Sequence, residues 1–477
     1  MKNIYIVYLL LIVLFSSCED FLDQQPKTQV DAEHMFQTEQ GFKDALTECY
    51  LKMANDRLYG LRLSISSIEL MAQHWQLSNT STELELKELD FSKSYARDLF
   101  MDIYEAQYNV IVQANDVLSY LGKYGDIIES EQLRGIIEAE ALAVRAFIHA
   151  DLLRMFGQMP QNASKKVSLA YAQTVGKEEI PFYDFDTYVE KLMADLDRAE
   201  ELFALYDPLV GKTMAASDAA DFSEEYFLTY RRYRFNLYAV QALKARLYLY
   251  LGRTADAYQY ASNLINAKTT NGESVLTLTG NSEFVQKHYS LPMESICLLA
   301  KTDLNNSMFT NSGYRINQSD YAAMFEGQSG IDYRSTMVWQ LDAASSWNRV
   351  YLFKKYEQPE IIGTIPTETI LKRQVVPLLR LAEMFLIAIE TAPNLSDAND
   401  YYRTFMASRG VIVSQDFSAE ELKTKIEQEY HREFYGEGQM FYYYKRHATP
   451  RMWGQSITSR DLTEDNYVVP LPSTELN

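Results

Sequence analysis

Cysteine is scarce in this chain, which has three among its 477 residues. Cys18 lies near the N-terminus, so only Cys49 and Cys297 remain in the body of the sequence. One distant pair is not a disulfide framework of the kind that staples small secreted domains. Pairing in an oxidising compartment is an alternative, but we expect both thiols to be buried and free.

Positive charge is also in short supply. The chain has 45 Lys and Arg against 65 Asp and Glu, which gives a formal net charge of −20. Proteins bind the phosphates of nucleic acids with Lys and Arg. The composition therefore excludes nucleic acid as a general partner, although it leaves room for a local basic patch.

The sequence lacks an apolar run long enough to be a membrane-spanning helix. The unbroken run over residues 4–15 would extend ~18 Å as a helix, well short of the ~30 Å hydrocarbon core. Lys2 precedes the run, and the small residues Ser16 and Ser17 follow it. This layout is typical of a secretory signal, and we predict that residues 1–17 are a signal peptide.

The residue after the predicted cleavage point is Cys18. Residues 14–18 resemble the lipobox of bacterial lipoproteins, with Phe15 where leucine is usual. An acylated thiol would anchor the chain, because each buried methylene contributes ~0.8 kcal/mol. We predict lipidation of Cys18 and an acidic tether over residues 18–30. The alternative is an ordinary signal peptide with an incidental cysteine.

Complete catalytic and metal-binding motifs are missing. Gly211-Lys212-Thr213 has the end of a phosphate loop, but Tyr206 stands where the upstream glycine belongs. Residues 327–330 fall one residue short of a nucleophile elbow. The six histidines include no His-x3-His pair, and the cysteines include no Cys-x2-Cys pair. We expect a protein without enzymatic activity, cofactor or metal.

Tyrosine, in contrast, is abundant, with 35 residues against 23 of phenylalanine. Most aromatic side chains of a large helical protein fill its core. Tyrosine, however, joins an apolar face to a polar tip, which suits surfaces that recognise sugars or peptides.

Apolar residues at helical spacing predict five helices, over residues 99–121, 135–156, 236–251, 255–264 and 378–391. Gly122 and Gly157 follow the first two where a C-terminal cap belongs. The third and fourth, joined at Gly252, resemble a tetratricopeptide helix pair.

Such pairs do not recur at the ~34-residue tetratricopeptide period, so long insertions must interrupt the array. The longest irregular zone is residues 269–369, with a β-prone run at 296–300. Loops of this length usually carry function. The predicted fold is all-α, with tetratricopeptide-like pairs, long irregular loops and minor β-hairpins.

Four stretches, taken in order, resemble the SusD/RagB family of surface lipoproteins of Bacteroidota. They are the acidic opening at 18–26, the helix at 140–157, the Arg-Leu-Ala-Glu helix at 376–386, and the block at 429–438 with Lys445-Arg446 after it. The last block departs from the family pattern, because His431 replaces an arginine and Tyr435-Gly436 precedes the glutamate.

The resemblance implies an N-terminal helical region over 31–268 and a C-terminal region over 269–477 with a loop-rich, ligand-facing segment. It also implies a lipoprotein on the outer face of the outer membrane, which serves as a nutrient-binding lid on a SusC-like TonB-dependent transporter. The expected cargo is an oligosaccharide. A peptide cargo, or a structural surface lipoprotein without its own ligand, are the alternatives.

Two stretches outside clear helices combine aromatic rings with polar side chains, as sugar recognition requires. The predicted ligand-binding residues are His74, Trp75, Tyr314, Arg315, Trp339, Trp347 and Arg349. The alternative for any single tryptophan is a core position beneath a loop.

Overall fold

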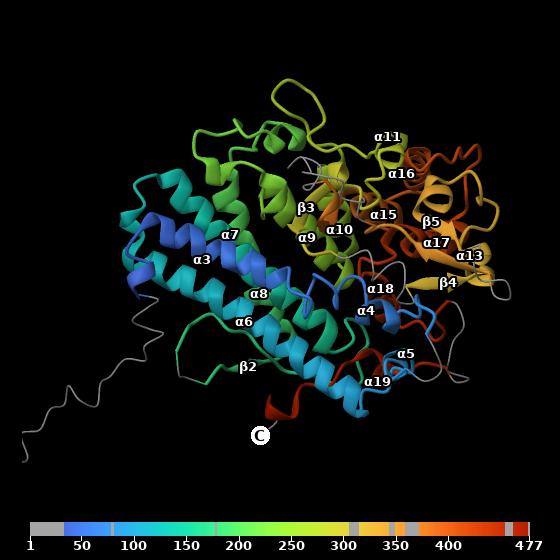
Figure 1. Ribbon diagram of the computed structural model, residues 1–477, viewed down its shortest axis with the longest axis horizontal. Helices are drawn as coiled ribbons and strands as arrows, with labels where there is room; N and C mark the ends of the chain where they lie inside the picture. Colours follow the sequence, from blue (N-terminus) through green and yellow to red (C-terminus); the bar gives the residue numbers. More distant parts are fainter. Residues whose placement is uncertain are drawn as a thin grey trace, which may run out of the picture.

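The computed structural model of the protein describes residues 33–77, 81–176, 179–304, 314–342, 349–357, 372–453 and 461–475. The predicted signal segment 1–17, the tether 18–30 with Cys18, and Trp347 lie outside these residues. Long helices of the N-terminal half form one side of the molecule, and the shorter helices and small sheets of the C-terminal half lie on the other (Figure 1).

Six helices build the N-terminal half: α3 (Glu39–Met53), α6 (Ser94–Tyr124), α7 (Glu131–Phe156), α8 (Phe185–Tyr206), α9 (Leu237–Tyr250) and α10 (Thr254–Ile265). From α6 onward, each packs on the next along the chain, and α3 packs on α6. This arrangement is the helix-pair architecture that the sequence predicts.

Helix α7 illustrates why the pattern holds. The Ser130 side chain accepts a hydrogen bond from the Leu133 amide at 3.2 Å, which caps the first turn. Small residues such as Ala139 and Ala143 are fully buried, because α6 and α8 pack on the helix from two sides. The helix ends at Phe156 with Gly157 at the cap, as predicted.

Helices α9 and α10 form the predicted tetratricopeptide-like pair. The Asn236 side chain caps α9 by accepting from the Ala239 amide at 3.0 Å. Gly252 turns the chain with a left-handed φ of +76°, which glycine adopts without steric cost. Helix α10 buries Ala257 and Ala261 and also packs on α15, so it joins the two halves.

Several predicted helix boundaries are wrong: α6 begins at Ser94 and α7 at Glu131, four to five residues before the predicted starts at 99 and 135. Helix α6 passes through Gly122 and ends at Tyr124 with Gly125 at its cap; one interior glycine costs only ~1 kcal/mol, which the packing of α6 overrides. The helix predicted over 378–391 begins at Leu381 instead. The residues before it form strand β7 (Val375–Arg380), whose β-branched Val375 and Val376 pair with a second strand.

That second strand is β3 (Ser295–Ala300), which confirms the β-prone run at 296–300. A three-stranded antiparallel sheet has the order β4 (Arg315–Asn317), β6 (Val350–Phe353), β5 (Trp339–Leu341). A small ladder joins β1 (Leu169–Ala170) to β2 (Phe182–Tyr183). The zone predicted as irregular thus carries most of the strands.

The remaining helices of the C-terminal half are α15 (Leu381–Thr391), α16 (Leu395–Ser408), α17 (Ala419–Phe434) and α18 (Met440–His447). The shorter helices of the N-terminal half are α4 (Ser67–Met71) and α5 (Leu84–Lys87). Those of the C-terminal half are α11 (Asn281–Val285), α13 (Gln318–Met324) and α19 (Glu464–Tyr467).

A buried ionic cluster joins these elements. Glu433 on α17 accepts hydrogen bonds from Arg380 at 2.6 Å, from Arg409 at 2.7 Å and from Arg334 at 2.9 Å. Burial opposes ionisation of Glu433, but Arg409 and Arg380 hold its pKa well below the usual range. One carboxylate therefore ties α17 to β7, to the end of α16 and to the segment before β5.

Cys49 and Cys297 are both buried and free, as predicted. Burial raises the pKa of Cys49 to about 12, so the thiol stays protonated at neutral pH.

Candidate ligand-binding site

The segments predicted to bind ligand meet at the β4–β6–β5 sheet. The loop after α4, residues 73–77, lies against the edge of this sheet, because the Gln76 amide donates to the carbonyl of Arg315 at 3.2 Å. Gln73 starts that loop with a left-handed φ of +67°. Residues more than two hundred positions apart in the sequence are thereby placed side by side.

Two of the predicted ligand-binding residues, Trp75 and Trp339, lie beneath this surface. Trp75 is 1% exposed, and its indole nitrogen donates to the Ile65 carbonyl at 2.7 Å. Trp339 is 5% exposed and packs 4.8 Å from the Phe353 ring. Tyr435 lies between them, at 4.8 Å from Trp75 and 5.0 Å from Trp339, measured between ring centroids. Both tryptophans are therefore core residues.

His74 belongs to a buried chain of hydrogen bonds. One ring nitrogen contacts the Glu69 carboxylate, and the other lies 2.9 Å from His431. His431 in turn lies 2.8 Å from the hydroxyl of Tyr444. Burial, with the charges of His74 and Arg432, lowers the pKa of His431 well below its usual value. This series of hydrogen bonds holds the 73–77 loop against α4, α17 and α18.

The structure thus buries His74, Trp75 and Trp339, three of the residues that the sequence predicts to bind ligand. Their side chains form the floor on which the sheet rests, because a large aromatic ring gains more from burial than from exposure. Of the other candidates, Tyr314 is half-buried and its ring packs 5.2 Å from Trp75. Arg315 and Arg349 are exposed at the rim.

The strand register defines the exposed side of the sheet. Arg315 and Gln340 flank Leu352 on opposite sides, so the three side chains form a row across β4, β6 and β5. Arg315 and Gln340 are exposed, and Leu352 is half-buried between them. A guanidinium, an amide and an apolar surface in one row fit hydroxyls and the C–H face of a sugar.

The two rim arginines differ from most of their kind in this chain. Several arginines at the surface elsewhere are ion-paired, as Arg403 is with Asp400 and Asp416. Within the described residues, the guanidinium groups of Arg315 and Arg349 have no hydrogen-bond or ion-pair partner.

Sequence reasoning missed Tyr351 and Gln340 at this site. Tyr351 is half-buried on β6 and stacks on Tyr321 of α13, with ring centroids 3.6 Å apart and planes 7° from parallel. The signal was the short β-prone run at 350–353, in which buried Val350 and Phe353 flank the half-buried Tyr351 and Leu352.

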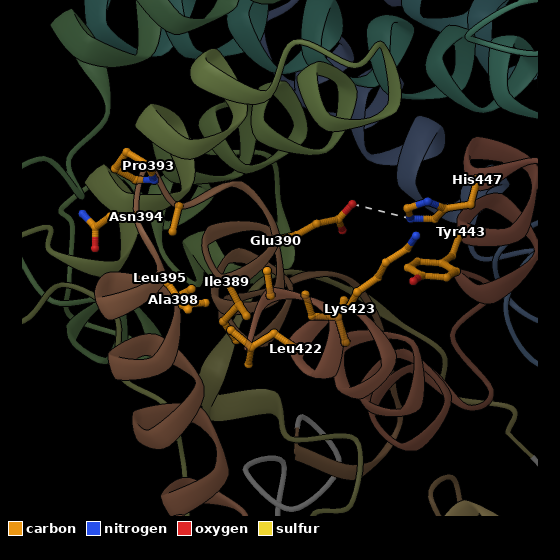
Figure 2. A pocket seen from close by; sticks show the side chains of 13 residues that line it. Ile389, Glu390, Pro393, Asn394, Leu395, Ala398, Leu422, Lys423, Tyr443 and His447 are labelled. Carbon is orange, nitrogen blue, oxygen red and sulfur yellow. Dashed lines mark ion pairs between the residues drawn. The ribbon is translucent and has the colours of Figure 1, made fainter. Parts of the chain in front are cut away.

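Figure 2 shows a separate concavity of about 550 Å³ between α15, α16, α17 and α18. Ile389, Leu395 and Leu422 give it an apolar floor. At one end Glu390 lies 3.5 Å from His447 and is also paired with Arg446. Against the effect of burial, Arg446 and His447 lower the pKa of Glu390 to about 2. The charges of Glu390, Arg446 and His447 at this end of the concavity therefore compensate one another.

Neither a membrane-spanning helix nor a metal site is seen among the residues that the structure describes. No helix there is both long and apolar enough to cross a membrane. No group of three or more His, Cys, Asp or Glu side chains in the same part of the chain is arranged to hold a metal ion.

Comparison with known proteins agrees with this architecture. The sequence profile of a SusD-like family, described as "Starch-binding associating with outer membrane", matches residues 20–249. SusD-like protein P25 of Formosa agariphila is 24% identical over 373 residues, which are 70% of this chain and 67% of that protein. SusD-like protein P2 of the same organism is 23% identical over 42% of this chain and 38% of that protein.

Solved structures share the fold over nearly the whole chain. A SusD superfamily protein of Bacteroides thetaiotaomicron superposes with a TM-score of 0.67 at 18% identity, over 92% of this chain and 97% of that one. A laminarin-binding SusD-like protein gives a TM-score of 0.64 at 17% identity, over 92% and 97% of the two chains.

Fold and sequence together define a predominantly helical protein that is similar to a family described as starch-binding and associated with the outer membrane. The chain is similar to SusD-like proteins in sequence over residues 20–249 and in fold over nearly its whole length.

Proposed function

We propose that this SusD-like protein captures an oligosaccharide on the exposed side of the β4–β6–β5 sheet and delivers it to a SusC-like TonB-dependent transporter. It would do so as a lipoprotein held by Cys18 on the outer face of the outer membrane. The protein binds its cargo and does not cleave it.

One observation carries the proposal. The loop at 73–77, both rim arginines and the short strands converge on one sheet whose floor is aromatic and rigid. A sugar needs a preorganised surface with polar donors at its edge, because ordering side chains on binding costs affinity. Arg315, Gln340 and the half-buried Leu352 between them provide such a surface.

The test is calorimetric titration of residues 19–477 with laminarin and starch oligosaccharides. We expect binding to one of them, weakened roughly tenfold or more in Arg315→Ala, because a hydrogen bond from a charged group contributes ~1.5–3 kcal/mol. Gln340→Ala should weaken binding less, as its amide is neutral. Arg253→Ala is the matched control: this arginine is also exposed but lies at the turn between α9 and α10, and its loss should leave affinity unchanged.

Other outcomes separate the alternatives. Binding of oligopeptides with no response to any glycan would replace the sugar by a peptide cargo. Equal affinity in wild type and Arg315→Ala would remove the ligand from this sheet. Chromatography of the bound oligosaccharide after incubation should recover it intact, and shortened products would contradict a binding role.

A further inference from the structure

A second cavity, of about 450 Å³, lies beside α11, on residues that the sheet site does not use. We call it the α11 cavity. Its lining comes from the segment before η3 (Met214–Asp218), the turn at 274–279, α11 and the loop after it. Its size falls in the ~300–1,000 Å³ range of small-molecule sites.

The wall of the α11 cavity is rich in hydroxyl groups. Thr213, Ser274, Thr277, Thr279 and Ser282 line it together with the amide of Gln286. These groups both donate and accept hydrogen bonds. Met214 and Val275 add small apolar surfaces between them. No aromatic ring except the imidazole of His288 is among its described lining residues.

One carboxyl group in this wall, that of Glu283, is only partly satisfied: Thr279 is close enough to lower its pKa, but one of its oxygen atoms accepts no hydrogen bond of normal geometry. Glu283 is 3% exposed; its Oε1 accepts from the Met293 amide at 3.3 Å, and the His288 ring lies 3.9 Å away. Its Oε2 is buried and has no hydrogen-bond partner within the described residues. A buried polar atom without a partner costs ~1–3 kcal/mol, so it calls for an explanation.

The same wall is held in a costly backbone conformation. Lys287 and Leu291, on the loop that follows α11, have left-handed φ values of +60° and +53°. Such residues cost of order 1–3 kcal/mol each and cluster at binding sites. Burial also raises the pKa of Glu283 to about 7, aided by the nearby Glu294. The group therefore carries a proton in much of the neutral range.

We propose that the α11 cavity binds one small neutral polyhydroxylated molecule of the size of a single sugar ring, with a ligand hydroxyl bonded to Glu283. The last torsion of a glutamate side chain is broad, so a rotation of the carboxyl group brings Oε2 to the cavity. The wall hydroxyls pair with the remaining ligand hydroxyls, and the apolar patches meet its C–H groups. The site is independent of the oligosaccharide surface on the sheet.

The test uses residues 19–477 and neutral monosaccharides (glucose, galactose, mannose and xylose, one at a time), with binding measured by saturation-transfer NMR and calorimetry. We expect at least one to bind. Glu283→Leu should weaken that binding by tenfold or more, and Glu283→Gln, which keeps the hydrogen bond, by no more than about threefold. Glu427→Leu on α17, another carboxyl whose pKa burial raises, should leave it unchanged.

Ser282→Ala covers the case in which Glu283→Leu fails to fold, because Ser282 is exposed and its truncation leaves the core intact. It should weaken monosaccharide binding severalfold. The proposal is overturned when no monosaccharide binds, or when the folded Glu283→Leu or Ser282→Ala protein binds as wild type does. It is also overturned when Arg315→Ala abolishes the signal, since the sugar would then occupy the sheet. If the protein binds a monosaccharide but no oligosaccharide, the proposed function fails and the proposal for the α11 cavity stands.

Discussion

The side chain of Trp75 is buried with both its indole N–H hydrogen-bonded and its ring packed against other aromatic rings. The indole nitrogen has a carbonyl partner at 2.7 Å, and the ring contacts Tyr314, Phe353 and Tyr435 within 5.3 Å. Trp75, which the sequence predicts to stack on a sugar, therefore packs beneath the sheet that carries the exposed side chains.

Truncation of Trp75 should accordingly reduce stability. We expect Trp75→Ala to lower the free energy of unfolding by ~3–5 kcal/mol, because it removes buried ring surface and leaves a cavity. Urea denaturation measures this change. Tyr226→Ala, at a ring that is 68% exposed, serves as control and should change stability by less than ~0.5 kcal/mol. If the Trp75→Ala protein were as stable as wild type, Trp75 would not be a core residue and would again be a candidate for ligand contact.

Glu283 predicts a pH dependence of stability. Its pKa is about 7 in the folded protein against an ordinary 4.5, so the folded state holds the proton more tightly. Its contribution is complete below pH ~4.5 and is lost as the pH rises through 7. Relative to wild type, Glu283→Gln should therefore gain stability from pH 5 to pH 8, by up to ~3 kcal/mol. Urea denaturation at both pH values tests this, and a constant difference would contradict it.

At the scale of elements, charge ties the C-terminal half together. Arg409, at the end of α16, donates to Glu294 at 2.8 Å and to Glu433 of α17 at 2.7 Å, and all three are buried. Buried ion pairs add little net stability, but loss of one partner leaves an uncompensated charge. The family-like block around Glu433 is thus explained by structure and not by ligand.

Arg409→Met should destabilise the protein by ~3–5 kcal/mol. Arg403→Met, which removes an exposed arginine from the same helix, should cost less than ~1 kcal/mol. Thermal and urea unfolding of the two variants make the comparison. Similar losses in both would show that burial of the cluster does not decide its contribution.

Periodicity predicts α7, α9 and α10 because their apolar positions repeat over three or more turns. It does not predict β4, β5 or β6, which have three or four residues each and are stabilised by pairing across a sheet. Their position came only with the tertiary structure. The boundary error at 378 has the same cause, since β7 exists through β3.

For the whole molecule, the proposed anchor precedes the first described residue by a short segment. Fourteen residues separate Cys18 from residue 33, and a chain of that length reaches at most ~50 Å. The body of the protein would therefore stay near the membrane surface.

Cys18→Ala should release the protein from the membrane fraction and leave oligosaccharide affinity unchanged, because the anchor and the sheet share no residue. Cell fractionation with metabolic labelling by a palmitate analogue measures the first effect. Cys49→Ala, at a buried thiol, should keep both label and membrane association. Membrane retention of the Cys18→Ala protein would show that lipidation is not the anchor.

The sequence by itself determined the helical class and the resemblance to SusD-like proteins, because periodicity and ordered motifs are local properties of the chain. Only the tertiary structure decided which aromatic residues are floor and which are surface. Burial depends on what a distant segment places over a side chain: the 73–77 loop meets β4 through a single backbone hydrogen bond, and that contact sends Trp75 inward while Arg315 faces the solvent.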